Sequence, residues 1–512
     1  MVNVMNIINK LYGGNEMQYL STRGDSERVG SAQAIKQGLA VDGGLFVPEK
    51  LVEVPKENLR DMQDSKYTDI AKSIFSRYLT DYTADEIEYC VTSAYNDKNF
   101  DHEDIAPLSF LKDRAVLELW HGPTCAFKDM ALQILPYFLV LAAKKTGEKS
   151  KIVILVATSG DTGKAAMEGF KDVEGTNIVV FFPEHGVSEV QKLQMLTQEG
   201  NNINVVAVEG NFDDCQSGVK EVFSDKDFNK DLNQKSYKLS SANSINWGRL
   251  IPQVVYYFSS YAKLVKQNKI TFGDKVNFVV PTGNFGNILA GYYAMKMGLP
   301  VNKLICAANS NNVLTDFIRT GIYDKNRDFL KSISPSMDIL ISSNLERLLF
   351  DITGDSSKIS KWMSELQQSG KYEVDNEVKE IIQRVFWSNY ATDEDTMDTI
   401  KKAWKNDNYL IDTHTAVAWK VYQDYKIETG DKTYTVILST ASPFKFNASV
   451  AQAILADKAK GKSEFELLDM LSAHTGWQIP EGLKNLDKKE MLHSDKINSN
   501  EIKKKVADIL GV

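Results

Sequence analysis

Cysteine and long apolar runs are scarce in this chain of 512 residues. Its four cysteines lie far apart and form no C-x-x-C pair, which excludes a disulfide framework and gives no zinc-binding pattern. The longest apolar run, residues 134–143, contains Pro136 and is far shorter than the ~20 residues that cross a bilayer. The first residues lack the pattern of a signal peptide. We therefore expect a cytoplasmic protein with no membrane span, no targeting segment and no metal.

Neither sign of charge dominates. The chain has 60 basic and 68 acidic residues, a formal net charge of −8. This balance argues against nucleic acid or an anionic membrane as the main partner. With 43% hydrophobic and 25% charged residues, the chain can bury a large core, and a disordered or collagen-like protein is excluded. At roughly 150 residues per domain, the length predicts about three structural units.

Common nucleotide, zinc and hydrolase motifs are missing as well. The segment SGDTGKAA (159–166) lacks the first glycine of a Walker A loop and the Ser or Thr that should follow Lys164. No strand is followed by G-x-G-x-x-G, and neither H-E-x-x-H nor G-x-S-x-G occurs. These absences count against NTP, NAD, zinc-protease and serine-hydrolase functions.

Short β-branched runs instead alternate with helical stretches. Strands are expected over 151–158, 177–183 and 204–210, with helices over 163–170, 188–196 and from 213. A second set has strands over 275–281, 303–309 and 434–440, and helices over 246–265 and 285–298. Such alternation is typical of parallel sheets covered by helices, so we expect two open α/β lobes that meet at a cleft.

The remaining segments differ in composition from this α/β core. Residues 1–100 predict an α-rich N-terminal segment. The core covers 101–460, with a smaller lobe at about 150–245 and a mostly helical insertion at about 310–430. The lysine-rich tail, 461–512, is expected to be helical, with its charges on solvated faces.

Three turns that follow core strands carry unusual polar residues: SGDTG (159–163), PTGNFGN (281–287) and STASPFKF (439–446). In open α/β sheets, ligands bind outside the carboxyl ends of the strands. In 281–287, two glycines three positions apart precede a helix, an arrangement that favours a phosphate cradle without a lysine. An ordinary glycine-rich turn is the alternative.

Lys128 stands at a junction between a strand and a helix in LWHGPTCAFKDMALQ (119–133), beside Phe127 and Met130. Burial would lower the pKa of this lysine and free its amine for Schiff-base chemistry. A lysine whose ammonium reaches the surface from a helix start is the alternative.

These segments resemble a known family. HGPTCAFKDMALQ resembles the pyridoxal-phosphate lysine motif of threonine synthases. Four further segments resemble other motifs of this family and occur in the same order: ATSGDTGKAA, NSINWGR (243–249), PTGNFGNILAGY and LSTASPFKF. YLSTRG (19–24) and QGLAVDGGLFVP (37–48) are similar to the family's opening segment. The resemblance covers nearly the whole chain and is strongest to the fungal and proteobacterial branch. It implies fold type II of the pyridoxal-phosphate (PLP) enzymes.

The resemblance also implies roles for individual residues. Lys128 would be catalytic and hold the cofactor, Thr440 would meet its pyridine nitrogen, and its phosphate would be bound by Gly283, Asn284, Phe285, Gly286 and Asn287. Asp161 would make hydroxyl or amide contacts at the cofactor, with a helix N-cap as the alternative. The substrate, O-phospho-L-homoserine, would be bound by Ser159, Thr162, Ser244, Asn246, Arg249 and Arg23. For Arg249 and Arg23 an ordinary ion pair is the alternative.

The implied reaction is γ-elimination of phosphate followed by β-addition of water, giving L-threonine. His414 and Thr415 echo a family motif and either line the cleft or serve in packing. Ser442 stands where the family commonly has histidine, with Phe444 after the proline. A serine/threonine dehydratase, a phospho-lyase that releases 2-oxobutyrate, and a catalytically silent binding protein are the alternatives. We expect a monomer or homodimer.

Overall fold

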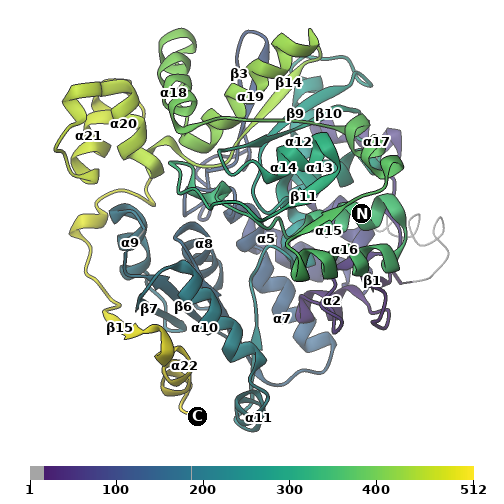
Figure 1. Ribbon diagram of the computed structural model, residues 1–512, viewed down its shortest axis with the longest axis vertical. Coiled ribbons are helices and arrows are strands. Elements are labelled where there is room, and N and C mark those ends of the chain that lie inside the picture. Colours follow the sequence, from purple (N-terminus) through teal and green to yellow (C-terminus); the bar gives the residue numbers. More distant parts are fainter. Residues whose placement is uncertain (1–15, 186) are drawn as a thin grey trace.

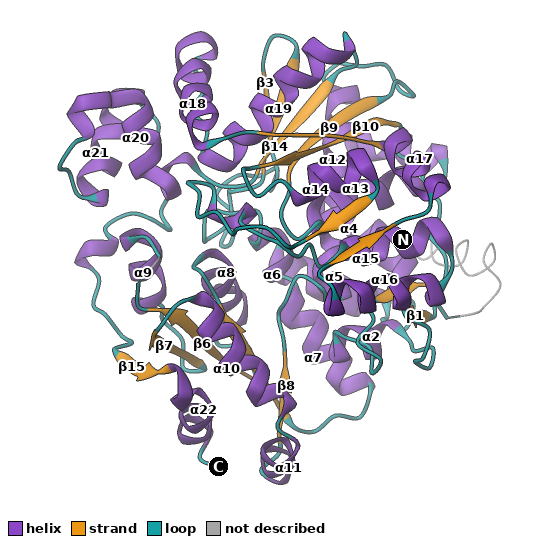
Figure 2. Ribbon diagram, in the orientation of Figure 1, coloured by secondary structure: helices purple, strands orange, loops and turns teal. Residues whose placement is uncertain are grey.

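Two sheets divide the chain into a larger and a smaller lobe (Figures 1 and 2). The computed structural model describes residues 16–185 and 187–512. The larger sheet has the order β13 (Phe386–Tyr390), β10 (Val301–Ala308), β9 (Val276–Pro281), β14 (Thr435–Ser439), β4 (Arg114–Glu118) and β3 (Leu108–Phe110). All neighbours in it are parallel except β3 and β4.

The smaller sheet is parallel throughout, with the order β15 (Asp495–Asn498), β7 (Ile203–Glu209), β6 (Thr176–Pro183), β5 (Lys151–Ala157) and β8 (Tyr237–Ser240). Its helices are α8 (Asp161–Phe170), α9 (Glu189–Leu196), α10 (Phe212–Ser224) and α11 (Lys226–Gln234). The central strands read as continuous apolar runs because helices cover both faces. The predicted pair of α/β lobes is confirmed.

Several strands lie where the sequence analysis expected none, among them β13, β8 and β15. Strand β13 belongs to the insertion and extends the larger sheet beside β10, and β8 closes one edge of the smaller sheet. In the C-terminal tail, β15 pairs with β7, and helix α22 (Ile502–Leu510) packs on α10. The tail is therefore not helical throughout, because it contains β15. In α22 the charged Lys503 and Lys504 are exposed, as predicted, while Ile502 and Val506 are buried in the smaller lobe.

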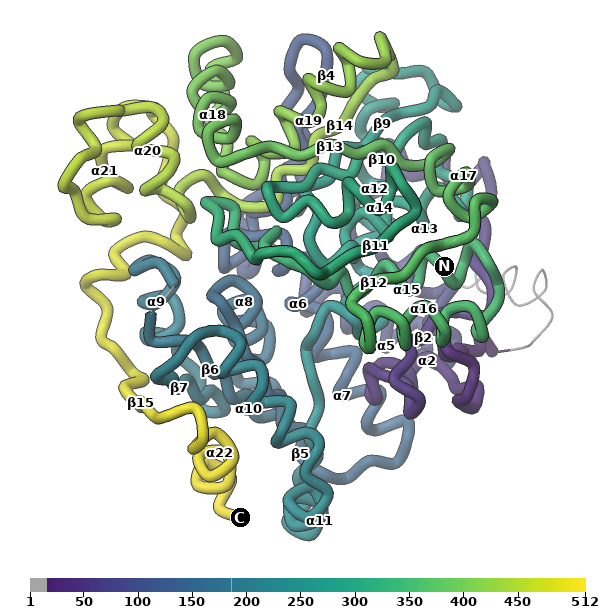
Figure 3. The backbone as a smooth tube through the Cα atoms, in the orientation of Figure 1, coloured from purple at the N-terminus to yellow at the C-terminus, as the bar shows by residue number. Residues whose placement is uncertain are grey.

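The tail also connects the two lobes. Figures 1 and 3 show it running from α21 (Glu464–Thr475), which lies next to α20 (Asn447–Leu455) beside the larger lobe, down to β15 and α22. On the way, Glu464 accepts hydrogen bonds from the backbone N–H groups of Glu189 and Val190, at the start of α9. The tail thus holds the smaller lobe by both its sheet and one of its helices.

The N-terminal segment is α-rich, as predicted. It has a two-stranded antiparallel sheet, β1 (Tyr19–Ser21) and β2 (Phe46–Pro48), and the helices α2 (Ser31–Gln37), α3 (Lys56–Asp61), α4 (Tyr67–Tyr78) and α5 (Ala84–Ala94). The first residues, on which the expectation of no signal peptide rests, lie outside the described part. In the described ranges, no helix has the length and apolar character needed to cross a membrane.

The insertion contains an antiparallel pair, β11 (Ile322–Asp324) and β12 (Lys371–Glu373), in addition to β13. Its helices are α14 (Val313–Thr320), α15 (Leu345–Thr353), α16 (Ser356–Gln368), α17 (Asn376–Val385), α18 (Asp393–Asp407) and α19 (Thr413–Thr429). Between β11 and α15 the chain runs irregularly through a short 3-10 turn, η2 (Pro335–Met337).

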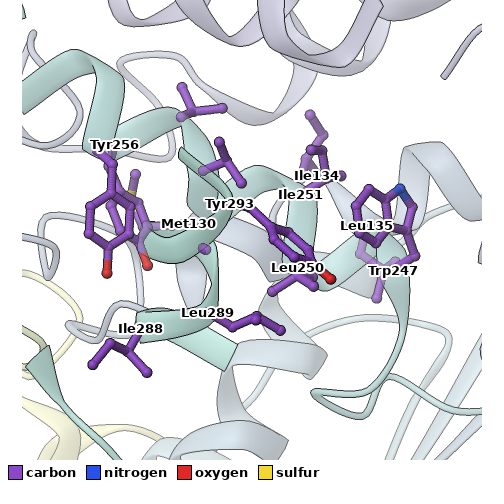
Figure 4. Packing of buried hydrophobic residues seen from close by; sticks show 14 of the residues in the cluster. Met130, Ile134, Leu135, Trp247, Leu250, Ile251, Tyr256, Ile288, Leu289 and Tyr293 are labelled. Atoms are coloured by element: carbon purple, nitrogen blue, oxygen red, sulfur yellow. The ribbon is translucent and has the colours of Figure 1, made fainter. Parts of the chain in front are cut away.

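One core supports the helices that carry the candidate site residues. Helices α6 (Asp129–Leu132), α7 (Leu135–Lys145), α12 (Trp247–Lys266) and α13 (Gly286–Lys296) pack side chains into it, and Figure 4 shows several of these. Met130, Leu250 and Ile288 are fully buried there. They neighbour Lys128, Arg249 and Asn287 in sequence, so close packing holds these three site residues in fixed relative positions.

Candidate active site

Lys128 ends the loop that joins β4 to α6, and this loop runs beside the turn after β14. Phe127 N donates to Thr440 O at 2.8 Å, and Ser442 N donates to Cys125 O at 3.0 Å. Cys125 takes a left-handed conformation, φ 59°, where the loop turns. These bonds bring the predicted residues Lys128 and Thr440 to one place although they are far apart in the chain.

The amine of Lys128 lies near two polar side chains and one aromatic ring. Its Nζ is 3.4 Å from Asp161 Oδ2, 3.2 Å from Ser336 Oγ and 5.0 Å from the centre of the Phe127 ring. Burial lowers the pKa of Lys128, and the cations of Lys445 and Arg249 lower it further, while Asp161 opposes the change. The direction agrees with the sequence prediction, and a lowered pKa favours the free amine that Schiff-base chemistry needs.

Asp161 is the first residue of α8. The N-cap is Gly160, so the alternative role of Asp161 as a cap is wrong. Its Oδ1 accepts from Gln191 Nε2 at 2.9 Å and its Oδ2 from Ser336 Oγ at 3.1 Å, both within the protein, so its contact with the cofactor stays a prediction. Burial would raise the pKa of Asp161, but Lys445 and Lys128 outweigh burial and hold it well below the usual range.

The sequence analysis missed Lys445 as a site residue. It lies in the 3-10 turn η3 (Pro443–Phe446), and its side chain is fully buried. Its Nζ donates to Thr124 O at 2.7 Å and is 3.2 Å from Asp161 Oδ1. Although STASPFKF was noted as a polar turn, a lone lysine after a proline has no pattern that would single it out.

Ser336 was missed too, because it comes from the insertion. Its backbone N donates to His414 Nε2 at 3.1 Å, and the other ring nitrogen of His414 is 2.7 Å from Asp412 Oδ2. His414 is buried and packs against the Phe446 ring, so it supports Ser336 and also serves in packing. The hydroxyl of Thr415 donates hydrogen bonds to Asp412 Oδ1 and Ser439 Oγ.

Hydrogen bonds also tie the segment around Ser336 to the end of β10. Asn309 Nδ2 donates to Asp338 Oδ1 at 2.7 Å, and Ser332 N donates to Asp338 Oδ2 at 3.0 Å. The segment 332–338 is therefore fixed from two sides, by β10 and by His414.

The turn between β9 and α13 has the shape expected of a phosphate cradle. Phe285 takes a left-handed conformation, φ 62°, and α13 starts at Gly286 with first-turn N–H groups that lack intrahelical partners. The Oδ1 of Asn287 accepts from Tyr256 at 2.6 Å and Tyr257 at 3.0 Å, but its buried Nδ2 has no partner in the described chain. Asn284 O accepts from Asn344 N at 3.1 Å. The Phe285 side chain is buried, which leaves only its backbone for a ligand.

Arg249 is a buried cation in the first turn of α12. Its Nη1 donates to Ala242 O at 2.7 Å, its buried Nε has no partner, and no carboxylate of the described residues forms an ion pair with it. Burial lowers its pKa to about 10, which still leaves it charged at neutral pH. A buried guanidinium without a counter-charge fits an anionic ligand.

Two of the predicted substrate residues have other partners. Arg23 pairs with Glu346 through two bonds of 3.0 Å and lines a pocket of about 560 Å³ that Ser342 and Ser343 also line. Asn246 caps α12, accepting from Gly248 N, and donates to Ile35 O. Arg23 thus forms an ion pair through Nε and Nη2, and Asn246 caps a helix. Their substrate contacts stay predictions.

The other predicted substrate residues are Ser159, Thr162 and Ser244. Ser159 is exposed, and Thr162 belongs to the first turn of α8 beside Asp161. Ser244 Oγ is 3.4 Å from Ser343 Oγ, next to Asn284.

Family models cover most of the chain. "Threonine synthase N terminus" matches residues 18–95, "Pyridoxal-phosphate dependent enzyme" matches 115–440, and "Threonine synthase, C-terminal" matches 415–498. The threonine synthase of Schizosaccharomyces pombe is 39% identical over 471 residues, 86% of this chain and 90% of the relative. The human protein threonine synthase-like 1 is also 39% identical, over 91% of this chain and 64% of its own length.

Solved structures agree with this assignment. The PLP-bound threonine synthase from Brucella melitensis superposes with a TM-score of 0.85 and 36% identity, over 97% of this chain and 99% of that one. The yeast threonine synthase gives 0.86 and 34%, over 96% and 99%. By sequence, by fold and by the residues gathered around Lys128, the chain belongs to the threonine synthase family of pyridoxal-phosphate dependent enzymes.

Proposed function

We propose that this chain makes L-threonine and inorganic phosphate from O-phospho-L-homoserine and water, with PLP as its cofactor. The observation that carries the proposal is the charge around Lys128. Lys445 and Arg249 add two more buried cations, and in the described chain only Asp161 forms an ion pair with any of the three. An excess of buried positive charge fits the phosphates of the cofactor and of the substrate.

The residues present fit the cofactor. The N–H groups at the start of α13 and the unpartnered Asn287 Nδ2 suit its phosphate, the Lys128 amine suits its aldehyde, and the Thr440 hydroxyl would face its ring nitrogen. When bound, PLP withdraws electrons from the carbon chain of the amino acid and so acidifies protons on that chain.

The chain's own residues then supply binding and proton transfer. Lys128 Nζ would take the proton from the substrate Cα and return it at the end of the reaction, with Asp161 and Ser336 directing that nitrogen. Arg249 would hold the leaving phosphate with its planar guanidinium. Ser442, where the family commonly has histidine, is fully buried and accepts a bond from Phe444 N, so the phosphate contact falls to Arg249.

A product assay tests this proposal. Purified protein loaded with PLP should convert O-phospho-L-homoserine into threonine and phosphate in equal amounts. Formation of 2-oxobutyrate would indicate the dehydratase or phospho-lyase alternative, and no turnover despite bound cofactor would indicate a binding protein. The assay matters because a relative named threonine synthase-like 1 is as similar as one named threonine synthase.

The cytoplasmic location and the monomeric or homodimeric state also belong to this proposal. The four cysteines are free thiols, which is compatible with a reducing compartment. Cell fractionation and sedimentation velocity would test the two points.

A further inference from the structure

Lys445 is an unusual group for a protein interior, because its whole side chain is buried and it has one carboxylate partner. Its Nζ contacts Thr124 O at 2.7 Å and Asp161 Oδ1 at 3.2 Å. Thr124 is itself fixed by Asp129, which accepts from its backbone N at 2.8 Å and its hydroxyl at 2.7 Å. A buried ammonium carries a large desolvation penalty, so its retention at this position points to a role.

Asp161 divides its two oxygens between two lysines. Oδ1 faces Lys445 and Gln191, whereas Oδ2 faces Lys128, at 3.4 Å, and Ser336. The carboxylate is thus nearer to Lys445 than to Lys128. If it turned fully toward Lys128, it would hold that amine in the charged form, which is inactive as a nucleophile and as a base.

The geometry points to Lys445 as a positioning residue that acts through Asp161: it holds one carboxylate oxygen away from Lys128, so that Lys128 stays directed but free to lose its proton. The inference rests on the assignment of Lys128 as the cofactor's lysine, and not on the identity of the product.

Other charged groups near this cluster are accounted for. The cation of Arg249 lowers the pKa of Lys128, and His414, which lies on the side of Ser336, lowers the pKa of Asp161. The carboxylates of Asp412 and Asp129 are bound to His414 and Thr124 respectively. Of the charged groups in the described chain, Lys445 is therefore the one that competes with Lys128 for Asp161 through a direct ion pair.

The test is a pH titration of the visible absorption of the PLP-bound protein, which changes when the nitrogen of Lys128 gains a proton. Lys445→Met should raise the midpoint by on the order of 1 pH unit, because Asp161 is then free to turn to Lys128. Lys445→Arg, which keeps the charge, should restore it toward the wild-type value. The matched control is Lys164→Met. Lys164 lies one turn after Asp161 in α8, and its Nζ pairs with Glu168 at 2.9 Å, so this substitution should leave the midpoint unchanged.

A double-variant cycle separates action through Asp161 from direct repulsion between the two lysines. In an Asp161→Asn background, Lys445→Met should shift the midpoint far less than in wild type. An equal shift in both backgrounds, or an unchanged midpoint in folded Lys445→Met, would overturn the inference. If Lys445→Met does not fold, Lys445→Gln, which keeps a hydrogen-bond donor without charge, replaces it. The same rise in the midpoint is then expected, and an equal shift in both backgrounds or an unchanged midpoint would again overturn the inference. A wild-type protein without any titrating band would instead contradict the proposed function.

Discussion

Arg249 and Arg23 differ in what balances their charge. Glu346 already pairs with Arg23, whereas Arg249 is buried with a carbonyl as its hydrogen-bond partner. Arg249→Lys keeps the charge but loses the planar guanidinium, so kcat/KM for O-phospho-L-homoserine should fall by about 30- to 1000-fold, or about 2–4 kcal/mol. Steady-state kinetics measures this effect.

Two controls belong to the Arg249 experiment. Arg23→Lys should change thermal stability more than kcat/KM, because its partner is Glu346. Binding of an amino acid without the γ-phosphate should be nearly insensitive to Arg249→Lys. If Arg249→Lys weakens both ligands equally, Arg249 supports the structure of the site and does not contact the γ-phosphate.

In the proposed site, Thr440 would offer one neutral hydroxyl to the cofactor. Thr440→Ala should therefore weaken PLP binding by only about 0.5–1.5 kcal/mol, a rise in Kd of about 2- to 13-fold. Equilibrium dialysis with PLP measures it. Thr435→Val, at the other end of β14, where the hydroxyl bonds Thr433 O, is the matched control and should leave Kd unchanged. Equal PLP affinities of wild type and Thr440→Ala would contradict the contact between Thr440 and the pyridine nitrogen.

At the scale of elements, segment 332–338 packs against Gly283 in the turn between β9 and α13, the predicted phosphate cradle. A Cβ at Gly283 would lie 2.7 Å from Ser336 O, too close for an unaltered backbone. Gly283→Ala should therefore loosen this segment, and hydrogen exchange should rise in 332–338 while α15 stays protected. Unchanged exchange in the segment would show that the turn and Ser336 are not coupled.

A second element-scale contact depends on pH. His121, three residues after the end of β4, lies between Asp101 and Glu118, with its ring nitrogens 2.6 and 2.8 Å from their carboxylate oxygens. Burial would lower the pKa of His121, but these carboxylates outweigh it and raise the pKa to about 9. Because the folded pKa exceeds the unfolded value, the stabilisation is full below about pH 6.5 and is lost as pH rises through about 9.

The expected result is a pH-dependent difference between wild type and His121→Gln. The wild-type protein should melt at a higher temperature at pH 6, by an amount that corresponds to on the order of 2–3 kcal/mol, and the difference should vanish near pH 10. A difference that stays constant from pH 6 to pH 10 would mean that His121 is held by packing alone.

At the scale of the whole molecule, the C-terminal tail holds the smaller lobe together. Strand β15 completes its sheet, and Ile502, Val506 and Leu510 of α22 cover the apolar side of α10. Deleting residues 494–512 should raise hydrogen exchange in β7 and α10 and leave β9 and β10 protected. Uniform protection after the deletion would contradict this role.

Much of this architecture could be predicted from sequence. Continuous apolar strands such as 151–158 and 275–281 are recognisable because both of their faces are buried. Strands β13 and β15 were missed because FWSNY and DKIN are short, and their pairing depends on β10 and β7, which are remote in sequence.

The site was predictable where a residue lies inside a recognisable turn. Lys128 and residues 283–287 are of this kind. Lys445 and Ser336 are not, because their roles arise from tertiary contacts with Asp161. Asn246 caps α12, a local role that the sequence analysis did not consider.

The central claim is that Lys128 holds the cofactor, and one measurement tests it most directly. The PLP-bound protein is reduced with borohydride, digested, and analysed by mass spectrometry for the lysine that carries the cofactor. We predict a single modified peptide containing Lys128, whereas modification of Lys445 or Lys164 in its place, or of no lysine at all, would contradict the account.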